Sequence, residues 1–252
     1  MKTRQILNIL VILLVLVVNF LANALPLNGQ GTGEISDRFP VLFTPAGYVF
    51  AIWGVIYLGL IAFAVFQALP AQKDNPRIIA ASPWFIASSL LNTAWIFMWH
   101  YNLLALSLLV MLGLLATLIM TYLKLEIGRA KPPRGEYLTT HVTFGIYLGW
   151  ISVATVANVT TVLYNLGWRG APLPEAAWSV VVLAVATALG LLMIRQRGEV
   201  AYPLVLVWAF GGIVVKHAAV APVAITAGLG VVVVALGLLL LPRMGKRPAA
   251  TR

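Results

Sequence analysis

The chain has 252 residues, of which 61% are hydrophobic and only 10% are charged, and its formal net charge is +10. Its mean hydropathy is +0.96, whereas soluble domains are about 45–50% apolar and about 25% charged. These values predict an all-α integral membrane protein, in which the basic residues report topology rather than binding to nucleic acid. Cysteine is absent, which excludes disulfides, thiolate catalysis and cysteine-ligated clusters.

Apolar segments separated by polar, Gly- or Pro-containing links predict eight transmembrane helices. The segments are residues 5–26, 47–69, 82–100, 103–124, 139–165, 176–194, 200–215 and 221–241. The first follows Lys2 and Arg4 and contains Ala22-Asn23-Ala24, so a cleaved secretory signal is the alternative to a retained helix. A run of about 20 apolar residues is long enough to span the bilayer, which favours retention.

The positions of the basic residues predict the orientation. If the N-terminus is cytoplasmic and all eight segments cross, every Lys and Arg lies on the cytoplasmic side except Arg38, Arg169 and Lys216. Cytoplasmic loops carry the excess of Lys and Arg in membrane proteins. We therefore expect both termini in the cytoplasm and a location in a bacterial inner membrane.

Three stretches combine aromatic and polar side chains at helical spacing. They are Tyr48, Phe50, Trp53 and Tyr57; Asn92, Trp95 and Trp99; and Tyr147, Trp150, Ala154 and Asn158. Spacings of three and four residues place side chains on one face of a helix. Because lipid cannot satisfy an amide, such faces are expected to meet protein or ligand.

Two interpretations of these faces remain open from the residues alone. If the faces converge, they line a cavity for a flat, largely apolar ligand. Alternatively, Asn92 and Asn158 only join helices by hydrogen bonds. Aromatic residues near helix ends, such as Trp99 and Tyr122, are assigned to the interfacial belt. The histidines lack metal-ligand spacing, so no metal site is predicted.

The same stretches resemble the signature segments of the TspO/MBR family, the tryptophan-rich sensory proteins that include the translocator proteins. Leu91-Asn92-Thr93-Ala94-Trp95 matches the family's Leu-Asn-x-x-Trp, and residues 147–158 match its Tyr-Leu-x-Trp…Ala-Thr…Asn. Residues 45–57 are similar to its second-helix entry, but Tyr48 replaces a Trp and Trp53 follows Phe50 one residue sooner. The resemblance covers about residues 5–166.

The resemblance implies a five-helix TspO-like bundle in residues 1–166, followed by an accessory three-helix segment with a basic cytoplasmic tail in residues 167–252. It implies a membrane-embedded binding or sensory protein with a pocket for tetrapyrroles (porphyrin or haem) or for sterol-like molecules. No cofactor is required. The pocket would be lined by Tyr48, Phe50, Trp53, Tyr57, Asn92, Trp95, Tyr147, Trp150, Ala154 and Asn158.

The resemblance leaves enzymatic activity undecided. One alternative is a light-dependent porphyrin-degrading enzyme that uses Trp53 and Trp150, and another is a small-molecule transporter. The Gly and Ala residues near 149–157 also leave a homodimer open.

Overall fold

The computed structural model describes residues 1–25 and 27–240, and all regular structure within them is helical. The long helices are α1 (Thr3–Ala24), α3 (Ile52–Ala68), α4 (Pro76–His100), α5 (Leu104–Lys124), α7 (Thr143–Asn165), α8 (Glu175–Arg197), α9 (Ala201–Lys216) and α10 (Ala221–Leu240). The short ones are η1 (Leu27–Gly29), α2 (Thr32–Asp37), η2 (Gly47–Ala51), η3 (Pro70–Gln72), α6 (Arg134–Glu136) and the π-helical η4 (Tyr137–Val142). The predicted helix ends at residues 26 and 241 and the basic tail lie outside the described residues.

Six helical stretches in the described part of the chain are long and apolar enough to cross a membrane. They are Thr3–Ala24, Gly47–Ala68, Leu104–Lys124, Arg134–Asn165, Glu175–Arg197 and Ala221–Leu240. Two of the predicted spans do not meet this criterion. Helix α9 is short, with 16 residues, and α4 has 25 residues but buries several serines and Asn92. The protein is therefore an integral membrane protein with multiple spans.

Two helices begin earlier than predicted. Helix α4 starts at Pro76 rather than at residue 82, because the Asn75 side chain caps it by accepting from the backbone N–H of Arg77 (3.1 Å) and Ile78 (3.4 Å). Proline is tolerated in the first turn, where its missing N–H has no partner to lose. The helix expected from residue 139 is extended back to Arg134 through α6 and η4.

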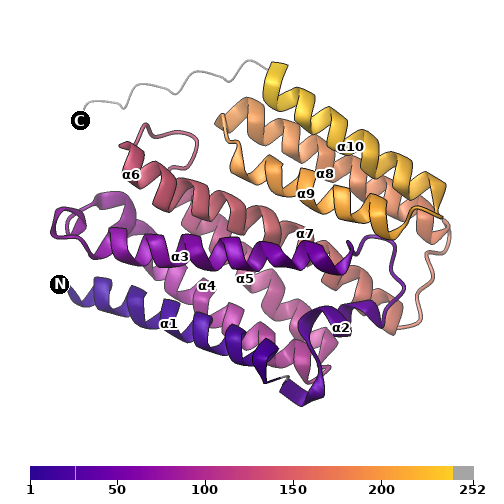
Figure 1. Cartoon of the computed structure of the whole chain (residues 1–252), viewed down its shortest axis with the longest axis horizontal. Helices are drawn as coiled ribbons and strands as arrows, with labels where there is room; N and C mark the ends of the chain where they lie inside the picture. The colour runs from indigo at the N-terminus through magenta and orange to yellow at the C-terminus, as the bar shows by residue number, and fades with distance from the viewer. Residues whose placement is uncertain (26, 241–252) are drawn as a thin grey trace.

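Five helices form a closed ring. Helix α3 packs on α1, α1 on α4, α4 on α5, α5 on α7, and α7 on α3. Helices α8, α9 and α10 lie together on one side of this ring, as Figure 1 shows, and α9 connects them to it by packing on α7. Figure 1 also shows α2 at one end of the ring.

Glycines allow α7 and α9 to approach closely. A Cβ on Gly149 would lie 3.0 Å from the Val205 Cβ, and one on Gly145 would lie 2.7 Å from Glu199 Oε1. Glu199 precedes α9 and accepts from the backbone N–H of Ala201 (3.1 Å) and Tyr202 (2.6 Å). Burial raises the pKa of Glu199, while these bonds oppose that shift. The carboxylate thus caps α9 at the contact with α7.

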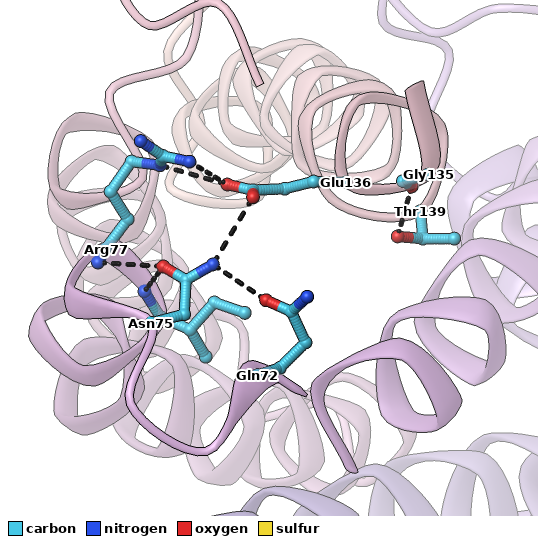
Figure 2. A network of polar contacts seen from close by, with 7 residues as sticks. Gln72, Asn75, Arg77, Gly135, Glu136 and Thr139 are labelled. Atoms are coloured by element: carbon cyan, nitrogen blue, oxygen red, sulfur yellow. Dashed lines mark hydrogen bonds and ion pairs between the residues drawn. The ribbon is translucent and has the colours of Figure 1, made fainter. Parts of the chain in front are cut away.

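The end of the ring opposite α2 is fixed by a buried polar network (Figure 2). Glu136 is 3% exposed and accepts two bonds from Arg77, from Nε at 2.9 Å and from Nη2 at 2.7 Å. Asn75 donates to the other Glu136 oxygen at 3.3 Å and to Gln72 Oε1 at 2.9 Å. This network ties the start of the α6–α7 stretch to the start of α4.

Phenylalanines fill the half of the ring nearest to that network. Phe63, Phe85 and Phe144, from α3, α4 and α7, meet edge to face with ring centroids 5.1–5.4 Å apart. This edge-to-face arrangement is the favoured geometry for packed aromatic rings. The other half of the ring, near α2, holds the predicted site.

Candidate functional site

An aromatic cluster occupies the α2 end of the ring. It consists of Phe50, Trp53, Tyr57, Tyr147 and Trp150. The Trp150 ring meets Phe50 (5.5 Å) and Trp53 (6.3 Å) edge-on, and Trp53 stacks on Tyr57 (5.6 Å) and meets Tyr147 (6.1 Å). Helical spacing on α3 and α7 places these rings on facing sides, so two of the three predicted stretches converge.

Asn158 joins the third stretch to this cluster. Its Oδ1 accepts from Trp95 Nε1 on α4 at 3.1 Å, and its Nδ2 donates to Ser107 Oγ on α5 at 3.1 Å. Trp95 stacks on Trp99 with centroids 5.4 Å apart. Asn158 therefore holds three helices together while it also lines a cavity.

Buried hydrogen-bond donors with one partner or none gather at the cluster. Asn92 Oδ1 accepts from Asn19 Nδ2 at 3.0 Å. The Trp150 Nε1 has no hydrogen-bond partner, and the Asn92 Nδ2 and the Tyr147 hydroxyl have only each other. A buried donor without a partner costs about 1–3 kcal/mol. These buried groups, beside one set of rings, retain hydrogen-bonding capacity that an acceptor from outside the protein could use.

Two cavities adjoin the cluster. The α1-side cavity, of about 190 Å³, is lined by Asn19, Asn23, Thr32, Gly33, Phe50, Trp53, Tyr57 and Ile96. The α7-side cavity, of about 40 Å³, is lined by Thr32, Ser36, Pro45, Phe50, Trp95, Trp99, Trp150, Val153, Ala154, Ala157, Asn158 and Thr161. Thr32 and Phe50 line both. They belong to residues 32–50, which we call the roof segment because it covers this end of the ring.

Tyr48 is the predicted site residue that the structure places elsewhere. Its side chain is 51% exposed and meets Trp208 of α9 edge-on, with centroids 5.5 Å apart. Assigning it to the pocket was wrong, because η2 is a 3-10 helix whose tighter turn separates Tyr48 from the face of Phe50 and Trp53. The other predicted residues lie together: Phe50, Trp53, Tyr57, Asn92, Trp95, Tyr147, Trp150, Ala154 and Asn158.

Several residues of the site were missed. Trp99 is 4% exposed and donates to the Thr32 carbonyl at 3.2 Å, so its assignment to the interfacial belt was wrong. The same assignment was wrong for Tyr122, which is 3% exposed. Asn19 and Asn23 stand four residues apart in the otherwise apolar stretch 9–24, and this spacing was a usable signal. Thr32 gave no signal, because it lies in a connecting segment.

A larger cavity lies outside the ring. This α3–α9 groove, of about 530 Å³, is lined by Ala51, Ile52, Val55, Tyr137, Val142, Ile146, Val200, Ala201, Leu204, Val205 and Trp208. The Trp208 Nε1 already donates to the Val49 carbonyl at 3.0 Å. No buried, unpartnered polar side chain lines the groove among the described residues. The groove is thus larger than the ring cavities, and its polar side chains are the Trp208 indole, which is already paired, and the exposed Tyr137.

The described residues contain no group of three or more His, Cys, Asp or Glu side chains that could hold a metal ion. What the site offers is ring faces, indole and amide donors, and enclosure by helices. Such a site suits an organic ligand with a flat apolar body and polar substituents.

The fold and the site define an integral membrane protein built on a five-helix ring with an aromatic interior. A family model described as TSPO-like protein matches residues 5–240. The chain belongs to this family, and the match includes α8, α9 and α10. No curated protein matches the chain, and no solved structure does.

Proposed function

We propose that the protein binds tetrapyrroles, such as protoporphyrin or haem, at the aromatic cluster. The observation that carries the proposal is the unpartnered Trp150 Nε1, with the Asn92 Nδ2 and the Tyr147 hydroxyl that have only each other, beside stacked aromatic rings. A porphyrin supplies a flat π-surface for the rings and propionate oxygens for the donors. Membership of the TSPO-like family supports the same class of ligand.

The cavities require the site to enlarge on binding. Pockets for drug-sized ligands measure about 300–1,000 Å³, whereas the ring cavities measure about 190 Å³ and about 40 Å³. Thr32 and Phe50 separate the two. Displacement of the roof segment would merge the two cavities into one space.

We also propose that all eight long helices cross the membrane, with both termini in the cytoplasm. Helix α4 is surrounded by α1 and α5, which are apolar enough to span. Its serines at 82, 88 and 89 and its Asn92 are buried inside the protein. Helix α9 is covered by α7, α8 and α10 in the same way. A helix enclosed by other spans needs less apolar surface than one that faces lipid.

The test is a protoporphyrin titration of purified protein, followed by quenching of tryptophan fluorescence. Trp150→Phe removes a donor, and Ala154→Leu fills the α7-side cavity; each should weaken binding about tenfold or more, which is about 1.4 kcal/mol. Ala184→Leu makes the same change on an exposed position of α8 and should leave the affinity unchanged.

The α3–α9 groove supplies the competing location. Leu204→Trp partly fills it at a residue that lines neither of the two ring cavities. If Leu204→Trp weakens porphyrin binding while Ala154→Leu and Trp150→Phe do not, the ligand binds in the groove and the proposal is wrong. Absence of saturable binding by the wild type would also contradict it.

A further inference from the structure

Helix α9 is not part of the ring, yet it holds the backbone of the roof segment. Trp208 Nε1 donates to the Val49 carbonyl at 3.0 Å, and the Ala46 N–H donates to the Gly212 carbonyl at 3.2 Å. The Gly212 carbonyl therefore accepts a hydrogen bond from a residue outside its own helix. Gly212 has no side chain, and this lets the roof segment lie directly on α9.

The end of α9 makes two more contacts to the same segment. His217 Nε2 lies 3.0 Å from the Thr44 carbonyl, and Lys216 Nζ pairs with Asp37 Oδ1 at 2.6 Å. Burial lowers the pKa of His217, so its imidazole is neutral at neutral pH, and the carbonyl partner requires the proton on Nε2. The roof segment is thereby attached to α9 from Asp37 to Val49.

The opposite side of the roof segment closes the aromatic site. Thr32 and Phe50 separate the two ring cavities, and Pro45 and Ser36 line the α7-side cavity. Pro45 is also the residue whose Cβ would lie 3.1 Å from a Cβ on Gly212. One short segment therefore contacts the site on one side and α9 on the other.

We propose that α9 controls access to the aromatic site by holding the roof segment closed, with Gly212, His217 and Trp208 as positioning residues. The inference rests on the proposed function for the identity of the ligand. Its physical basis is that the apparent affinity of a site falls with the fraction of molecules in the open state. Contacts that exist only in the closed state lower that fraction. The C-terminal helices thus belong to the binding unit.

A reversible cross-link tests the proposal directly, because the chain has no native cysteine. Disulfides join residues whose Cβ atoms lie about 3.5–4.5 Å apart, and the Cβ atoms of Pro45→Cys and Gly212→Cys would lie 3.1 Å apart, within reach of a disulfide after a small shift. Both cysteines are placed in a Val49→Ala background, which serves as the matched control and removes the Val49 methyl that a Cβ on Gly212 would overlap. The oxidised protein should lose protoporphyrin binding about tenfold or more, and reduction should restore it. Equal binding by the oxidised and reduced forms would overturn the inference.

The outcome for the wild type separates the two proposals. If wild type does not bind protoporphyrin, the proposed function fails. If wild type binds and the oxidised double variant binds equally well, only the role of α9 fails.

Two adjacent glycines give a measurement that needs no ligand. A Cβ on Gly212 would overlap the Val49 side chain, whereas one on Gly211 has nothing within 4 Å. Gly212→Ala should speed hydrogen exchange of the amides in residues 44–50, and Gly211→Ala should not. Equal exchange in the two variants would show that α9 does not hold the roof segment.

Discussion

The Glu136 carboxylate is buried and depends on Arg77 for its pairing. Breaking a buried pair by removing one partner leaves an uncompensated charge and typically costs 3–5 kcal/mol. Arg77 is partly exposed, so we expect Arg77→Met to lower the free energy of unfolding by about 3 kcal/mol. Arg134→Met removes an exposed arginine from the neighbouring turn and should have little effect. Reversible unfolding in detergent would measure both, and equal losses would contradict the account.

The site residues that could be predicted from the sequence are those that recur at helical spacing along one helix. Trp53, Tyr57, Trp150 and Asn158 share faces because α-helical spacing repeats over α3 and α7. Tyr48 lies in η2, where a 3-10 turn changes the direction of each side chain. The α-helical spacing therefore does not place Tyr48 on the face of Trp53 and Tyr57. Trp99 lies near the end of α4, and only the tertiary contact with Thr32 shows that it is buried rather than interfacial.

Between elements, the α7–α9 contact depends on Gly145 and Gly149, where added Cβ atoms would lie 2.7 Å and 3.0 Å from α9-side atoms. We expect the double variant Gly145→Ala, Gly149→Ala to destabilise the protein by about 1–3 kcal/mol, the usual cost of overpacking. Gly54→Ala, on α3 with nothing within 4 Å of an added Cβ, is the control. If the thermal unfolding temperature of the double variant is no lower than that of Gly54→Ala, the close contact between α7 and α9 is refuted.

The helices themselves were largely predictable because long apolar runs report spans. The early start of α4 was missed because it depends on a cap from Asn75. The attachment of α9 to the roof segment could not be predicted, since it joins residues more than 150 positions apart along the chain and uses backbone carbonyls that no side-chain pattern reports.

Over the whole molecule, the proposed topology places the two ends of each helix on opposite sides of the membrane. Single cysteines at Lys131 and Gln196 should react with an impermeant maleimide only after permeabilisation, and cysteines at Leu166 and Ala219 should react from outside. Because the chain has no native cysteine, all labelling comes from the introduced residue. Labelling of Gln196→Cys and Ala219→Cys from the same side would show that α9, at 16 residues, does not cross.

The most direct measurement of the central claim is an experimental structure of the protein determined with protoporphyrin. We expect the macrocycle between α3 and α7, stacked on rings of the aromatic cluster, with a propionate at the Asn92, Tyr147 or Trp150 donors and the roof segment displaced from α9. A macrocycle in the α3–α9 groove, with the aromatic cluster unchanged, would contradict it.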